Sequence, residues 1–258
     1  MIIAVVLAVL MNIFSYWYSD KIVLAISKAK KIEKKDNPEL YLLVENLSIT
    51  AGLPMPRIYI INEDQPNAFA TGRNPQNGVI AVTRGLLEKL ERVELEGVLA
   101  HELAHIGNRD ILLSTIVVVL LGMIVIMTDF FFRISFWGGA GRNDKDSGGL
   151  RIIMIVVALA LAILAPLIAQ LMKLAISRKR EFLADSSGAL LTRHPEGLAR
   201  ALEKISRDPN PLKVANDATS HLYISNPFRG KNKNSWLHKL FLTHPPAEER
   251  IAKLRGKK

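Results

Sequence analysis

Near the middle of the chain the sequence reads His101-Glu102-Leu103-Ala104-His105, the H-E-x-x-H pattern. Apolar residues recur at helical spacing through this region, so we expect a helix that packs against a core. Positions i and i+4 of a helix share one face, so the two imidazoles can meet one zinc ion. Glu102 lies on a neighbouring part of that face, where it can take a proton from an attacking water. The alternative interpretation is a helix that carries two solvated histidines.

A zinc ion that does chemistry needs a third protein ligand and an open position. The chain has no cysteine, which excludes disulfides and thiolate ligands and leaves His, Asp or Glu. The best candidate is Glu181, which begins a five-residue sequence that ends at Asp185. Asp185 is then placed to accept a hydrogen bond from the free N–H of a ligand histidine. The alternative is an exposed acidic pair that follows the basic residues 178–180.

Three long blocks of the sequence are nearly free of charge, in a chain that is 49% hydrophobic with a mean hydropathy of +0.19. A membrane span needs about 20 apolar residues, so we expect each block to cross a membrane. Buried core helices are the alternative. A cleaved signal peptide is a further alternative for the first block, but no basic residue precedes it and aromatic residues end it, which favours an uncleaved anchor. The blocks are Ile2–Tyr18, Ile111–Met127 and Ile152–Ile176.

The net charge of +10 is placed beside these blocks. Basic residues cluster after the first and third blocks, whereas the loop between the second and third blocks carries few. The positive-inside rule therefore predicts that the clusters lie in the cytoplasm and the loop outside. This placement favours a lipid bilayer as partner and speaks against nucleic acid. It also makes the second and third blocks a hairpin that returns Glu181 to the side of His101.

The expected organisation is a membrane anchor at 1–20, a first catalytic part at 21–110, a transmembrane hairpin at 111–176 and a second catalytic part at 177–258. Capping signals and periodicity predict a mostly helical α+β domain with a small sheet and inserted transmembrane helices. The expected strands are 57–61, 67–71 and 79–83. The expected helices are 38–50, 86–90, 93–109, 177–191, 195–206 and 245–254.

Three stretches in this order carry a family resemblance: residues 67–72 (Asn-Ala-Phe-Ala-Thr-Gly), 94–105 and 178–185. Together they resemble the HtpX family of membrane-anchored zinc endopeptidases, which is related to the CAAX prenyl proteases. The resemblance implies a zincin-like (gluzincin) fold, one Zn²⁺ per chain with Glu181 as third ligand, and Asp185 beside a ligand histidine. It also implies cleavage of membrane proteins, misfolded or damaged ones, in quality control. Together with the charge placement, this predicts a catalytic site at the cytoplasmic side of the cell membrane. The family usually has two hydrophobic segments before the catalytic domain, and this chain shows one.

The resemblance also suggests how substrate is held. In zinc proteases of this kind an edge strand beside the metal pairs with extended polypeptide, and β-strand addition makes little demand on side chains. The residues of this chain that would serve are Asn67, Ala68, Phe69 and Ala70. An ordinary hairpin strand is the alternative.

Stabilisation of the oxyanion needs a further donor besides the metal. His244 and Arg250 resemble the corresponding stretch of the prenyl proteases, where both residues lie near the site. His221 is the alternative donor. For His244 and Arg250 the other interpretation is a surface helix that begins at proline.

Two other functions compete with a membrane-bound endopeptidase. An intramembrane metalloprotease would place the H-E-x-x-H pattern within a span, but charged residues on both sides of it would be costly there. A non-catalytic membrane scaffold would use zinc structurally, and such sites are usually closed by four protein ligands. Three ligands and a glutamate favour catalysis. The oligomeric state and the natural substrate stay open.

Overall fold

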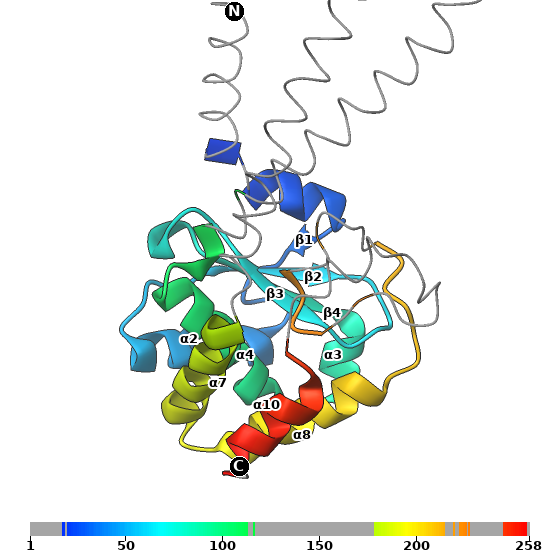
Figure 1. Cartoon of the computed structure of the whole chain (residues 1–258). Helices are drawn as coiled ribbons and strands as arrows, with labels where there is room; N and C mark the ends of the chain where they lie inside the picture. The colour runs from blue at the N-terminus through cyan, green and yellow to red at the C-terminus, as the bar shows by residue number, and fades with distance from the viewer. Residues whose placement is uncertain are drawn as a thin grey trace, which may run out of the picture.

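The computed structural model describes residues 17–18, 20–112, 116, 178–214, 219, 222–225, 227 and 245–256, and within these it shows an α+β arrangement with a mixed sheet (Figure 1). The strands are β1 (Lys30–Lys31), β2 (Arg57–Ile61), β3 (Ala68–Thr71) and β4 (Val79–Thr83). The helices are α2 (Pro38–Ala51), η1 (Pro75–Asn77), α3 (Arg84–Lys89), α4 (Arg92–Gly107), α7 (Arg178–Thr192), α8 (Pro195–Arg207) and α10 (Ala247–Leu254).

The elements expected from the sequence lie within a few residues of their predicted bounds. At the start of α2, for example, the Asn37 side chain accepts a hydrogen bond from the backbone N–H of Leu40 at 3.0 Å. Pro38 follows in the first turn, where its missing N–H costs nothing. Strand β1 was not expected, because two exposed lysines carry no alternation of polar and apolar residues.

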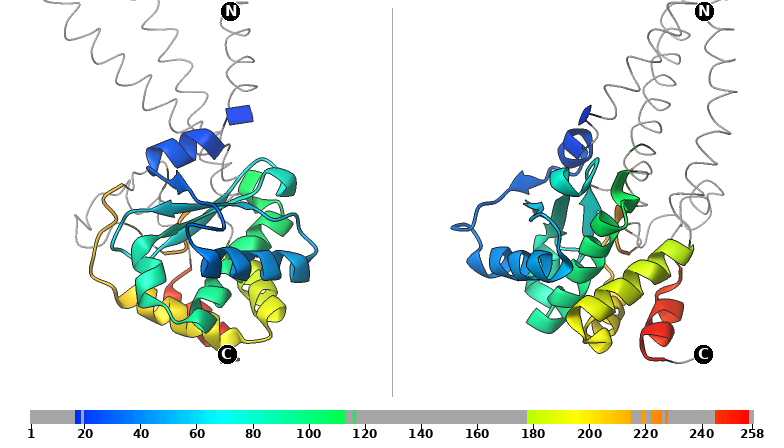
Figure 2. Two further views of the ribbon diagram at one scale, coloured as in Figure 1. Left: turned by 180° about the vertical axis from the view of Figure 1, so that it is seen from behind. Right: turned by 90° about the vertical axis from the view of Figure 1, so that its left-hand side faces the viewer.

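The sheet has the order β1-β2-β4-β3, with β2 and β4 parallel and the other neighbours antiparallel. Strand β4 is central and all five of its residues are buried, whereas β3 lies at the edge. Helices α2, α4, α7, α8 and α10 lie on one side of the sheet, and the helical residues 20–26 lie on the other (Figures 1 and 2). On this side of the sheet, the edge strand β3 contacts α4, the helix that carries the H-E-x-x-H pattern.

Two glycines bring neighbouring helices unusually close to α4. A Cβ atom at Gly188 of α7 would lie 2.9 Å from the backbone nitrogen of His101, and one at Gly97 would lie 2.7 Å from the nitrogen of Leu198 in α8. Real Cβ atoms do not approach backbone so closely, so both crossings depend on the absence of a side chain. The first crossing sets the distance between the start of α7 and the histidines.

The described residues contain no helix that is both long enough and apolar enough to cross a membrane. Of the first hydrophobic block they include only Trp17 and Tyr18, of the second only residues 111, 112 and 116, and of the third none. The three predicted spans therefore lie outside the described residues, apart from these positions, and stay predictions.

Candidate metal centre

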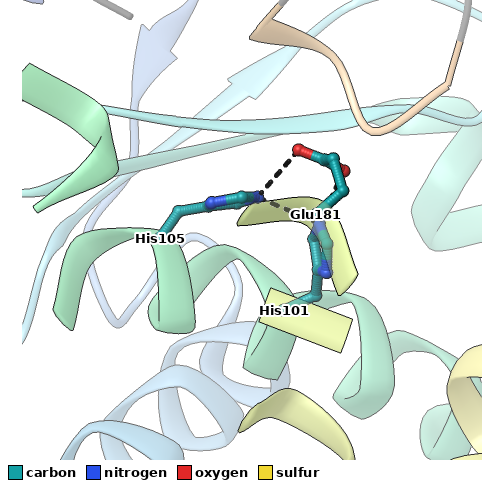
Figure 3. A group of neighbouring side chains, drawn as sticks. All are labelled: His101, His105 and Glu181. Carbon is teal, nitrogen blue, oxygen red and sulfur yellow. Dashed lines mark hydrogen bonds and ion pairs between the residues drawn. The ribbon is translucent and has the colours of Figure 1, made fainter. Parts of the chain in front are cut away.

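His101, His105 and Glu181 meet at one point between α4 and the start of α7 (Figure 3). The Nε2 atoms of the two histidines are 3.1 Å apart. The Glu181 carboxylate lies beside them, with Oε1 3.5 Å from Nε2 of His105 and Oε2 3.8 Å from Nε2 of His101. One ligand atom from each residue lies within 4.8 Å of the other two. The structure thus brings together the three residues that the sequence predicts as metal ligands.

Each imidazole is oriented through its other ring nitrogen. Asp185 Oδ1 lies 3.0 Å from Nδ1 of His101, and Asp110 Oδ2 lies 3.1 Å from Nδ1 of His105. A carboxylate at Nδ1 favours the tautomer with the proton on that atom, which leaves the lone pair of Nε2 available. Both lone pairs are therefore directed to the same small volume, as a metal ion requires.

Two arginines hold these two carboxylates. Arg250 bonds Asp185 twice, from Nε to Oδ2 at 2.9 Å and from Nη2 to Oδ1 at 2.6 Å. Arg180 donates from Nη1 to Asp110 Oδ1 at 2.7 Å. The Arg250 guanidinium holds the pKa of Asp185 at about 2, although burial alone would raise it. Asp185 is therefore ionised at neutral pH and accepts hydrogen bonds from both His101 and Arg250.

Arg250 itself is 1% exposed, and its third nitrogen, Nη1, donates to the backbone oxygen of Ile224 at 3.1 Å. All three guanidinium nitrogens thus have partners within the protein. These contacts favour a role in holding Asp185 over the predicted role as a donor to the oxyanion. The other two predicted donors, His244 and His221, lie outside the described residues.

The two histidines have opposite electrostatic environments. Burial and the nearby Arg250 charge lower the pKa of His101 to about 4, so this imidazole is neutral at pH 7. Burial also opposes the charged form of His105, but the hydrogen bond to Asp110 and the carboxylates of Glu181 and Glu102 raise its pKa to about 9. The carboxylates around His105 therefore stabilise a positive charge beside its imidazole, whether that charge is a proton or a bound cation. Two imidazoles and one carboxylate are also a donor set that catalytic zinc takes, so the residues fit this metal.

Glu102 is 2% exposed and lies in α4 beside the first histidine. Its carboxylate is close enough to His105 to raise the pKa of that imidazole. It is thus a buried acid next to the three ligand atoms, where the sequence places the proton acceptor.

Part of the edge of β3 is already paired. The Ile224 N–H donates to the Ala68 oxygen at 3.0 Å, and the Asn67 side-chain amide donates to the Ser225 oxygen at 3.0 Å. Of the four residues predicted to hold substrate, Asn67 and Ala68 therefore contact residues 222–225. Phe69 points its main-chain groups to β4, where it is paired with Ala81. The backbone of Ala70 faces the same outer edge as Ala68, since main-chain groups alternate in direction along a strand.

Asp110 is the site residue that the sequence reasoning missed. The sequence shows an aspartate five residues after His105, within a short run of charged residues. In the sequence alone, that run served only as an argument against a membrane span at this point. A carboxylate soon after a ligand histidine is the signal that identifies such a partner.

The sequence is similar to known proteins over nearly all of its length. The model of a family described as "Peptidase family M48" matches residues 34–258. A protein named "Protease HtpX homolog" from Syntrophobacter fumaroxidans is 52% identical over 263 residues, which cover 99% of this chain and 89% of that protein. One of the same name from Pyrococcus furiosus is 50% identical over 258 residues, covering 99% and 86%.

A solved structure, "Crystal Structure of S. mikatae Ste24p", is similar with a TM-score of 0.53 at 21% identity. The similarity covers 98% of this chain and 57% of that one. At this identity it shows a shared fold alone.

Proposed function

Since this chain belongs to peptidase family M48 and is a metalloendopeptidase homologous to HtpX, we propose that it binds one zinc ion and cleaves misfolded or damaged membrane proteins at the cytoplasmic face. The zinc ligands in this proposal are His101, His105 and Glu181. The observation that carries it is the approach of the two Nε2 atoms to 3.1 Å with the Glu181 carboxylate beside them.

Zinc held at this point would supply a Lewis acid that polarises a water and a peptide carbonyl. The protein supplies the remaining chemistry. Glu102 accepts the proton of the attacking water and passes it to the leaving amine, as a general base and then a general acid. Asp185 and Asp110 keep His101 and His105 in the ligating tautomer.

A chain of contacts joins the zinc ligands to the strand proposed to hold substrate. Arg250 bonds both Asp185 and the Ile224 oxygen, and the Ile224 N–H bonds Ala68 of β3. Substrate would add to the edge at Ala70, next to this paired stretch, with main-chain hydrogen bonds. This arrangement requires little of the substrate sequence, which suits damaged proteins as substrates.

Membrane location is part of the proposal. The three uncharged blocks and the basic residues beside them support an anchor at 1–20 and a hairpin at 111–176 inserted between the two catalytic parts, 21–110 and 177–258. Charged residues on both sides of the H-E-x-x-H pattern support a site at the membrane surface.

The test uses full-length protein in detergent or nanodiscs, with a destabilised membrane protein as substrate. The parent should contain about one zinc ion per chain and should cleave the substrate until a chelator removes the metal. Glu102→Gln should keep its zinc and lose about 10²–10⁴ in turnover, because an amide cannot accept the proton.

Glu88→Gln, at an exposed glutamate of α3, is the matched control and should cleave like the parent. If Glu102→Gln cleaves the substrate at the parental rate, Glu102 is not the general base. A chain that holds zinc but cleaves nothing would instead favour a membrane scaffold.

A further inference from the structure

A pocket of about 310 Å³ lies where the end of the first hydrophobic block and the residues after it meet the sheet, away from the metal centre. Three of its lining side chains are basic, two are aromatic and one is acidic. These are Lys21, Arg57, Arg73, Trp17, Tyr18 and Asp20.

Only one of the three basic side chains is paired with the acid. Arg57 Nη2 lies 2.5 Å from Asp20 Oδ2 and 3.3 Å from the Asn77 oxygen. Arg73 and Lys21 form no ion pair with any carboxylate of the described residues. The pocket therefore carries two positive charges for which the described part of the chain offers no counter-charge.

Both of these cations lie over aromatic rings. The Arg73 guanidinium is 4.2 Å from the centre of the Trp17 ring, and the Lys21 Nζ is 4.9 Å from that of Tyr18. Stacking on an aromatic ring orients a guanidinium while leaving the N–H groups, which lie in the plane of the guanidinium, available to a ligand. A planar guanidinium and an ammonium together suit the oxygens of a phosphate group.

The loop that carries Arg73 is held in one shape. Gly72 has a φ of 134°, and a Cβ there would lie 2.5 Å from the Asn77 oxygen, so another residue would not fit. Asn74 closes the following turn by accepting from the Asn77 backbone N–H at 2.9 Å. Arg73 is thus presented from a fixed turn at the end of β3, and its side chain is partly buried there.

The position of the pocket indicates the source of the phosphate. Trp17 and Tyr18 end the hydrophobic block Ile2–Tyr18 and are 54% and 42% exposed, as aromatic residues at a membrane interface are. We propose that this pocket binds the phosphate of an anionic phospholipid headgroup from the cytoplasmic leaflet. The lipid source rests on the membrane anchor proposed above, whereas the phosphate chemistry rests on the pocket alone.

The test measures lipid binding to the full-length chain. Protein is released from nanodiscs of phosphatidylcholine mixed with phosphatidylglycerol, and retained lipid is counted by native mass spectrometry. The parent should retain phosphatidylglycerol in preference to phosphatidylcholine. Arg73→Gln and Lys21→Gln should each weaken this retention about fivefold, and the double variant about 25-fold, from the usual contribution of one basic residue at an anionic surface. Arg73→Lys, which keeps the charge, should lose less than Arg73→Gln.

Lys31→Gln is the matched control, because it removes the same charge from exposed strand β1 outside the pocket. If it weakens retention as much as Arg73→Gln, the attraction belongs to the whole basic surface and the pocket is not a site. Equal retention of both lipids by the parent also overturns the proposal. If inorganic phosphate displaces the lipid at low concentration and binds as well without a membrane, the site takes free phosphate and the lipid assignment is wrong.

Cleavage of a soluble peptide is measured on the same samples. Arg73 and Lys21 lie outside the metal centre, so this activity should be unchanged in their variants. Loss of lipid selectivity is thereby distinguished from a failure of the proposed protease function.

Discussion

Arg250 and Asp185 form a doubly hydrogen-bonded, fully buried ion pair beside His101, with distances of 2.9 and 2.6 Å. The pair joins α10 to α7 and reaches the proposed zinc ligand through Asp185 Oδ1. Arg250 comes from the last helix of the chain, so the metal centre depends on the C-terminal segment being in place.

Removal of one member of this pair should be more harmful than removal of both. Arg250→Leu leaves the Asp185 charge buried without its partner, and we expect a loss of about 3–5 kcal/mol in unfolding free energy. The double variant with Asp185→Leu should lose less than Arg250→Leu alone, and therefore less than the sum of the two single variants. Thermal and chemical unfolding of the four proteins measures this. Strict additivity would show that the two residues do not act as a pair.

The same arginine also distinguishes two roles in catalysis. If Arg250 positions Asp185, Arg250→Ala should lower zinc affinity together with turnover. If it donates to the oxyanion, the variant should keep its zinc and fold while turnover falls by about 10²–10³. Zinc affinity by chelator competition and kcat on one substrate decide between them, and the contacts of Arg250 lead us to expect the first result.

Asp110→Asn should weaken zinc binding by about 10–100-fold, because Asp110 orients His105 and raises the basicity of its ring. It should also lower the pKa of His105, which lies at about 9 in the metal-free protein, and NMR titration can follow this ring. Asp64→Asn makes the same chemical change at an exposed residue paired with Arg84 and should affect neither quantity. An unchanged His105 pKa in Asp110→Asn would exclude the positioning role.

Gly188→Val should push α7 away from α4, because a side chain there would collide with the His101 backbone. We expect a loss of about 1–3 kcal/mol in stability and reduced zinc retention, since Glu181 lies on the displaced helix. Ser186→Val places the same side chain on the exposed face of α7 and serves as the control for helix propensity. Full zinc retention by Gly188→Val would mean that the close crossing does not set the ligand distance.

The acid sensitivity of the metal-free protein should depend on Asp185. Its pKa is about 2 in the folded protein against an ordinary value near 3.8, so the ionised form stabilises the fold. That contribution, about 2 kcal/mol, is present above about pH 4 and is lost as the pH falls toward 2. Asp185→Asn cannot titrate, so its melting temperature should fall less over this range than that of the parent. Both are measured with chelator, and parallel pH profiles would contradict the assignment.

The sequence by itself determined the features that depend on local geometry. Helical spacing placed His101 and His105 on one face, the Asn37-Pro38 cap marked the start of α2, and strands β2 and β4 appeared at their expected bounds. Residue chemistry also pointed to Glu181, because the absence of cysteine left few ligand types. The helix, cap and strand conclusions follow from interactions among residues a few positions apart, which a single sequence displays. The choice of Glu181 rested instead on residue type, on the predicted hairpin and on the family resemblance.

The contacts between distant segments were decided only by the tertiary structure. The Asp110–Arg180 pair, the Ile224 N–H at Ala68 and the closed set of partners around Arg250 each join segments far apart in the chain. No periodicity encodes such pairs, because they arise when helices pack at distances set by residues such as Gly188. The sequence therefore supplied the candidate ligands, and packing decided which carboxylates and arginines hold them in position.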